Sequence, residues 1–505
     1  MSQLKKDFVF KLFTNIIRIP VSFLLQSIYP RILGPIAYGN FDYLNDFANK
    51  IVGFLDSGVS VAFYTRLSQD KFNRKIVKFY SWLVLLIIIV YILLVITTYL
   101  NSFYIIIWPG QDFIIILLST LLGVVTFCSN NIFRMIDACE QTIKGEWVKM
   151  GQLILTSLVV ILFYFIFKKV TLEIFYIIQI ILIIVLLFSL YFIFKKSGFL
   201  SLQSTSLSKN EKIYYSKYFW TYASPLLVTG VIALISGIGE RWILQRYGGS
   251  VEQGYFALSS KIGALIFLFT SAMMPLLMRE TSKLFGLNQI VLIKNLFLKN
   301  LKILYCLVTF MAVYVSINSH FIIKILAGNK FTQAGVVVAL MAYYPIHQTV
   351  GQINSTLFMS TERTKEYRNI SLFFIPFTVI FSYFFIAPKS QFGLGLGALG
   401  LGIEMIFIQI VVQNVLLFFN CKYLKISFIK IIFYQIWIIL MLLLIGYIEY
   451  ILICIMESNI YIIAISHFLI FTTSILMLVY IYPKIIGLAN SQQILQIFII
   501  KQTNN

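Results

Sequence analysis

Long apolar runs alternate with short polar connections along the whole chain. A run of about 20 residues is what an α-helix needs to cross the hydrocarbon core of a bilayer. Because lipid cannot hydrogen-bond a bare backbone, such runs predict membrane-spanning helices. Taking runs bounded by charge, glycine or proline, we predict about fourteen spans, near residues 8–28, 40–64, 80–100, 111–133, 150–167, 172–194, 218–240, 253–278, 300–323, 332–359, 369–387, 394–419, 427–448 and 459–482.

A basic, serine-rich segment divides the spans into two sets. We predict an all-α polytopic membrane protein with an N-terminal six-helix bundle (8–194), a basic cytoplasmic linker (195–215), a C-terminal six-helix bundle (216–419) and an additional transmembrane helix pair (427–482). The residues of the last pair do not indicate its role.

The basic residues predict the orientation of the chain. Most Lys and Arg side chains lie in every second connection, whereas the other connections are short and hold few of them. Because cytoplasmic loops carry the excess of basic residues, both termini are expected in the cytoplasm. Met1 to Asp7 leads into a run that is long enough to span and lacks a small-residue cleavage motif, so we expect no cleavable signal peptide.

Composition excludes several classes of protein. The chain has 60% hydrophobic residues and a mean hydropathy of +0.90, far beyond what a water-soluble domain carries. The net charge of +21 is spread over short clusters between apolar runs, so it indicates topology and not a nucleic-acid partner. The five cysteines fall singly, without a CxxC pair, and support neither a disulfide framework nor a metal site.

Two pairs of segments indicate an internal repeat. The turn from Leu33 to Phe41 and the turn from Tyr247 to Phe256 each hold paired glycines, with Gly34 and Gly39 matching Gly249 and Gly254. Later in each half, the segment 131–144 matches the segment 354–365. A parallel repeat of spans is an architecture of secondary transporters, whose substrate site lies between the halves.

These features resemble the polysaccharide-transporter branch of the multidrug/oligosaccharidyl-lipid/polysaccharide exporter superfamily, which includes O-antigen flippases of the Wzx type. The resemblance covers nearly the whole chain and rests on the LeuGlyPro...TyrGly turn, the GlyTyrPheAla...Lys opening of the eighth span and the AlaGlyAsnLysPhe...Ala run at 327–334. It implies two six-helix bundles around a central cavity that opens alternately to either side.

Charged residues inside the first span form a polar stripe. Lys11, Asn15, Arg18 and Ser22 fall within about 60° on a helical wheel. Lys11 is close enough to the cytoplasmic end to snorkel, whereas Arg18 lies about 15 Å deep. We therefore predict that Arg18 faces a cavity.

The second span carries carboxylates on one face, with Asp42, Asp46 and Asp56 together and Lys50 at the margin. One interpretation is structural: Asp42 and Asp46 pair with Lys50, or with Lys11 and Arg18, and hold the first two spans together. The other is that these carboxylates titrate or exchange partners during transport, as intramembrane acids of proton-coupled carriers do. The two interpretations are compatible.

Further charges occur in the second half. Lys261 aligns with Asp46 from the paired glycines and is a cavity candidate, and the deeper Glu404 is a candidate proton carrier or a packing partner. Glu240 and Arg241 lie at the outer end of the seventh span, where an interfacial ion pair explains them as well as a role in binding.

The function predicted from the residues and the resemblance is a flippase for a polyprenyl-diphosphate-linked oligosaccharide in the bacterial cytoplasmic membrane, with the substrate's diphosphate on Lys11, Arg18, Lys50 and Lys261 and ion coupling through Asp42, Asp46, Asp56 and Glu404. The expected partners are an undecaprenyl-diphosphate-linked glycan, membrane lipid, and a polysaccharide polymerase with its chain-length regulator. Two alternatives stay open: a cation-coupled multidrug exporter of the same superfamily, and an O-antigen polymerase or ligase. No nucleophile–base constellation or nucleotide-binding loop is visible, so we expect a non-enzyme without a cofactor.

Overall fold

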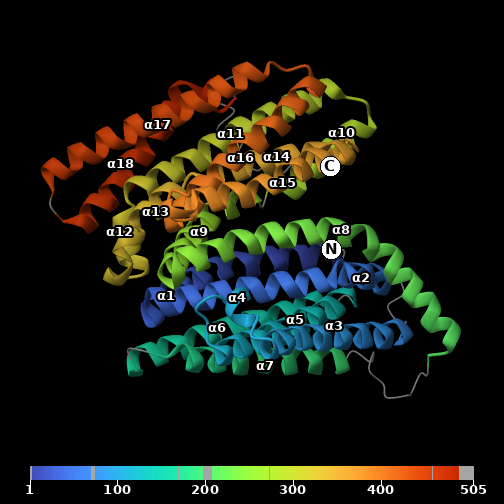
Figure 1. Ribbon diagram of the computed structural model, residues 1–505. Coiled ribbons are helices and arrows are strands. Elements are labelled where there is room, and N and C mark those ends of the chain that lie inside the picture. The colour runs from blue at the N-terminus through green and yellow to red at the C-terminus, as the bar shows by residue number, and fades with distance from the viewer. Residues whose placement is uncertain are drawn as a thin grey trace. The chain divides into compact units, whose positions relative to one another are not determined.

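The computed structural model describes residues 3–69, 74–139, 141–167, 170–196, 207–271, 273–457 and 459–487. Throughout these ranges the regular elements are helices and no strand occurs, which confirms the predicted all-α class (Figure 1). Nine helices within the same ranges are long and apolar enough to cross a membrane. The chain is a multi-pass membrane protein.

The helices form two compact units, Met1–Gly254 and Tyr255–Asn505. The first unit holds α1 (Gln3–Asp56), α2 (Val59–Gln69), α3 (Arg74–Leu100), α4 (Tyr104–Ile107), α5 (Phe113–Ala138), α6 (Thr142–Phe167), α7 (Leu172–Lys196), α8 (Lys209–Tyr247) and the first turns of α9 (Gly249–Ser271). Its core is aromatic: Tyr43, Phe47 and Tyr176 are buried among the helices, and Phe63 stacks on Tyr80 with ring centroids 3.9 Å apart.

The second unit holds the remainder of α9, together with α10 (Met274–Gly286), α11 (Ile290–Ile317), α12 (Ser319–Leu326), α13 (Gly335–Met341), α14 (Tyr344–Ser360), α15 (Thr364–Ile386), α16 (Gly397–Leu424), α17 (Phe428–Met456) and α18 (Ile460–Ile481), with short 3-10 turns at Asn329–Ala334, Lys389–Gln391 and Pro483–Ile486. The last two helices pack on α11. Tyr314 of α11 donates to the Ala464 carbonyl of α18 at 3.1 Å, and Asn318 meets His467 at 2.8 Å. His467 is thus a helix-packing partner.

The order of elements repeats along the chain. After the first pair of spans comes a short helix, α2 of 11 residues in one half and α10 of 13 in the other. After the third span of each half comes a still shorter helix, α4 or α12. The predicted bundles, 8–194 and 216–419, group helices by this repeat, whereas the division by contacts places α8 with the first unit. The predicted bundle bounds stay a prediction.

Several predicted boundaries differ from the observed ones. The predicted spans 8–28 and 40–64 fall on the two helical segments of α1, which a kink at Gly34 (φ 72°) separates, but the second segment ends at Asp56 and not at residue 64. A second break at Ser57 and Gly58 separates α2 from α1. Helix α8 begins at Lys209, inside the predicted linker, because Ser208 and Glu211 form a capping box there.

The two repeated glycine turns pack directly against each other within the first unit. A Cβ atom at Gly39 would overlap the Ser250 carbonyl oxygen and lie 2.6 Å from the backbone nitrogen of Gly254. A Cβ atom at Gly254 would overlap the Pro35 carbonyl oxygen. Glycine at both positions therefore lets the backbone of α1 and the first turn of α9 approach more closely than any other residue would allow.

We expect Gly39→Ala to destabilise the protein, because the new methyl group would overlap backbone atoms of Ser250 and Gly254. Backbone atoms cannot move aside by changing rotamer, as a side chain can. The cost of such overpacking is about 1–3 kcal/mol, and the change should appear as a lower midpoint of thermal unfolding in detergent. Gly53→Ala is the matched control on the same helix, since nothing lies within 4 Å of a Cβ there. Equal midpoints for the two variants would contradict the close packing.

Candidate functional site

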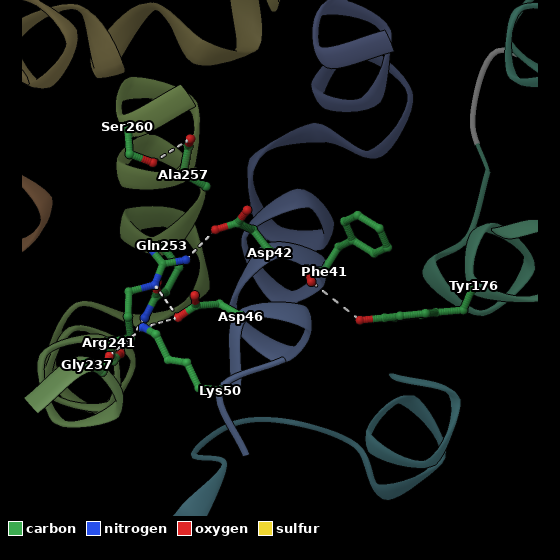
Figure 2. Close-up of polar contacts among 10 residues, drawn as sticks. All are labelled: Phe41, Asp42, Asp46, Lys50, Tyr176, Gly237, Arg241, Gln253, Ala257 and Ser260. Carbon is green, nitrogen blue, oxygen red and sulfur yellow. Dashed lines mark hydrogen bonds and ion pairs between the residues drawn. The ribbon is translucent and has the colours of Figure 1, made fainter. Parts of the chain in front are cut away.

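A cluster of four charged side chains joins α1 to α8 in the first unit (Figure 2). Asp42, Asp46 and Lys50 follow one another at helical spacing on α1, and Arg241 reaches them from α8. The Arg241 guanidinium donates to the Asp42 carboxylate, and its Nε lies 3.9 Å from Asp46 Oδ2. Lys50 Nζ donates to Asp46 Oδ2 at 2.6 Å.

The Arg241–Asp42 pair is the more buried part of the cluster. Arg241 has 8% and Asp42 17% of the side chain exposed, whereas Lys50 and Asp46 each keep about a third. A charge buried inside a protein is costly, and truncating one partner leaves the other uncompensated. The Asp46–Lys50 end of the cluster is the more accessible one.

Gly237 on α8 makes room for Lys50. The ammonium donates to the Gly237 carbonyl at 2.7 Å. A Cβ atom at position 237 would lie 3.2 Å from Lys50 Cε and 3.3 Å from Nζ. The absence of a side chain there therefore lets Lys50 bind both the α8 backbone and Asp46.

In the structure Asp46 pairs with Lys50, and Asp42 has a partner that the sequence analysis did not assign. For Arg241, the sequence analysis left open an interfacial ion pair with Glu240 and a role in binding. A signal was present, since Arg241 precedes Gly249 by the same separation at which Asp42 follows Gly34. Where two antiparallel helices meet at their glycine turns, residues at equal distances from the two turns lie opposite each other, as Arg241 and Asp42 do.

The basic stripe of the first span is described only in part. Arg18 is half-buried on α1, and the side chain of Lys11 lies outside the described residues. The role predicted for both residues stays a prediction.

Asp56 belongs to a separate cluster at the end of α1. Its carboxylate accepts from the Ser60 backbone amide at 3.1 Å and from the Ser60 hydroxyl at 2.5 Å. Arg134 of α5 donates to Ser60 Oγ and lies 3.9 Å from Asp56 Oδ2. These contacts cap α2 and tie it to α5.

The other two predicted site residues lie in the second unit. Lys261 is half-buried on α9, and Glu404 on α16 is 1% exposed. Whether either residue contacts substrate or carries a proton stays a prediction.

The second repeated motif places a buried asparagine in each unit. Asn131 of α5 accepts from the Tyr80 hydroxyl at 2.7 Å, and Asn354 of α14 donates to the Gln413 carbonyl at 2.9 Å. Asn420 donates to Asn354 Oδ1 at 3.2 Å and accepts from Arg363 at 3.2 Å. The sequence analysis matched these segments but did not identify the network around Arg363.

The described residues contain no group of His, Cys, Asp and Glu side chains able to hold a metal ion. What the cluster on α1 and α8 offers instead is a set of carboxylates and cations that neutralise one another, and that can exchange partners if a carboxylate is protonated or an anion arrives.

Comparisons with known proteins place the fold. No protein-family model matches the sequence, and no curated protein matches it significantly. Among solved structures, the lipid II flippase MurJ in an inward closed conformation aligns over 93% of this chain and 98% of its own, with 15% identity and a TM-score of 0.65. An inward-facing multidrug resistance MATE family transporter of the MOP superfamily aligns over 81% and 94%, with 13% identity and a TM-score of 0.58.

A third similar structure is a MOP superfamily transporter from Pyrococcus furiosus whose binding pocket is described as of reverse polarity. It aligns over 84% of this chain and 95% of its own, with 14% identity and a TM-score of 0.50. The chain therefore has the fold that flippases and multidrug transporters of the MOP superfamily share.

We expect Arg241→Gln to lower the free energy of unfolding by about 3–5 kcal/mol, because it leaves the Asp42 carboxylate buried without its cation. Adding Asp42→Asn should restore much of the loss, since the double variant carries no unpaired charge. The measurement is thermal or denaturant unfolding in detergent of the two single variants and the double variant.

Arg279→Gln is the control for this cycle, because Arg279 and its partner Glu280 are 74% and 47% exposed. The loss there should stay below about 1 kcal/mol. A double variant less stable than both single variants would refute the pairing of Arg241 with Asp42.

Proposed function

We propose that this protein is a flippase for a polyprenyl-diphosphate-linked oligosaccharide, an O-antigen or capsule/exopolysaccharide repeat unit, in the bacterial cytoplasmic membrane. It works by alternating access, is driven by an ion gradient, has both termini in the cytoplasm and is not an enzyme. The observation that carries the proposal is the cluster of Asp42, Asp46, Lys50 and Arg241 on α1 and α8.

The cluster supports transport because it places two carboxylates and two cations in mutual contact on helices of a membrane protein. Intramembrane ionisable residues mark substrate or ion pathways. A fold shared with flippases and multidrug transporters is consistent with this assignment.

The basic members of the cluster favour an anionic substrate. The diphosphate that links a polyprenyl chain to a glycan is a dianion at neutral pH, and it would be bound by a guanidinium as a bidentate fork and by an ammonium as a point charge. Lys50 is the accessible cation in the cluster, with 33% of its side chain exposed. Arg18 and Lys261 are further cations within the spans, and Lys11 precedes Arg18 on the same helix. The polyprenyl tail stays in lipid while the glycan crosses.

Coupling follows from competition for the same cations. Protonation of Asp46 would release Lys50, which would then be free for a diphosphate oxygen. When the carboxylate ionises again, it would compete with the diphosphate and favour release. Asp42 can act in the same way on Arg241, whereas Asp56 and Glu404 remain further candidates for the coupling site.

The multidrug exporter remains the second candidate because it shares the fold. A pocket for lipophilic cations requires acidic and aromatic walls, and the cationic positions Arg18, Lys50 and Lys261 favour the anionic substrate instead.

Deleting the gene in its host should cause lipid-linked oligosaccharide to accumulate in the cytoplasmic leaflet, as measured by mass spectrometry and leaflet-specific labelling. The wild-type gene should reverse the accumulation. Arg18→Gln or Lys261→Gln should reduce the rate of transport by about tenfold or more, because each variant loses the binding free energy of one charge-assisted hydrogen bond. The exposed Lys283→Gln is the charge-matched control. Normal surface glycan together with new drug sensitivity would overturn the flippase assignment in favour of the exporter.

Collapsing the proton and sodium gradients with ionophores should stop transport in inverted vesicles. Asp46→Asn should make the remaining transport insensitive to the gradient, because Lys50 no longer has a titratable partner. Transport of the wild-type protein that persists after both gradients are collapsed would remove ion coupling from the proposal.

A further inference from the structure

A cavity of about 770 Å³ lies between α3 and the first turns of α8, apart from the charge cluster described above. Its lining combines two lysines, Lys78 and Lys212, with apolar side chains and two serines; the other residues are Phe79, Ser81, Trp82, Leu85, Leu207 and Ser216. The transport mechanism proposed above does not use this cavity.

Aromatic and ionic contacts join α3 to α8 beside the cavity. The Phe79 ring stacks on Phe219 of α8 with centroids 5.7 Å apart, and it lies tilted against Tyr215 at 5.5 Å. Lys75 of α3 donates to Glu211 of α8 at 2.5 Å, and this hydrogen bond holds the pKa of the Glu211 carboxyl below its usual range. Both contacts hold α3 and α8 together beside the cavity.

Exposed apolar side chains of α3 line another part of the cavity, where we expect contact with lipid. Trp82 and Leu85 lie on α3, a candidate membrane span, with 61% and 54% of their surfaces exposed. Tryptophan is enriched where a helix passes from hydrocarbon to headgroups. Lys78 and Lys212 are exposed and lie at the end of the span that the basic residues place in the cytoplasm.

From this arrangement we infer that the cavity binds an anionic phospholipid of the cytoplasmic leaflet. The phosphate group lies between Lys78 and Lys212, and an acyl chain follows Trp82 and Leu85 along α3. A basic pocket beside an apolar helix face is the chemistry that recognises an anionic lipid headgroup. The inference requires only that α3 crosses the membrane, and it holds for a flippase and an exporter alike.

Trp82 supplies a local readout. The full-length protein is reconstituted in nanodiscs of phosphatidylcholine and phosphatidylglycerol in equal parts, with bromine on the acyl chains of one lipid or the other. The quenching lost in Trp82→Phe reports the lipid at this cavity. We expect brominated phosphatidylglycerol to quench Trp82 more strongly than brominated phosphatidylcholine, whereas equal quenching would overturn the inference.

Paired substitutions test the headgroup contact. Lys78→Gln with Lys212→Gln should abolish the preference for phosphatidylglycerol, a change of about tenfold or more in relative occupancy. Lys283→Gln with Lys422→Gln removes the same charge from exposed positions elsewhere and should leave the preference unchanged. A preference that survives the first pair would also overturn the inference.

Two competition arms identify the source of the phosphate group. Millimolar inorganic phosphate should not relieve the quenching, because the apolar wall contributes to binding. Undecaprenyl phosphate should displace phosphatidylglycerol no better than its mole fraction predicts. Displacement by free phosphate, or by traces of the polyprenyl lipid, would assign the cavity to that ligand and not to a membrane phospholipid.

Discussion

The structure depends on one constraint, which is that a charge placed among membrane helices must meet an opposite charge there. Arg241 and Asp42 satisfy it across two helices, and Asp46 and Lys50 satisfy it along one. The first pair joins α8 to the second half of α1. Neutralising these two buried charges and packing α1 against α8 are thus achieved by the same contact.

Much of the fold could be predicted from the sequence, because length and hydropathy alone specify a spanning helix. Helices α7 and α18 follow the predicted spans 172–194 and 459–482 closely, whereas α3 begins before the predicted span 80–100 and α17 ends after the predicted span 427–448. The least predictable elements were short. Helices α2 and α4 contain too few residues to give a periodic signal.

Charged helices were harder to interpret than apolar ones. The carboxylate face of α1 was visible from spacing, and so was the pairing of Asp46 with Lys50, because both residues lie on one helix. The partner of Asp42 lies on another helix, and a sequence does not state which helices touch. The hydrogen bonds of Asn354 with Asn420 and of Asn420 with Arg363 depend likewise on the packing of α14 and α16.

The glycine contact between the two turns is reciprocal. Position 39 meets position 250 and position 254 meets position 35, and these are equivalent places in the two copies of the repeat. Two identical subunits related by a twofold axis make this pattern, in which residue i meets j and j meets i. Within the first unit, the two turns therefore contact each other in the same reciprocal way as the two surfaces of an isologous interface.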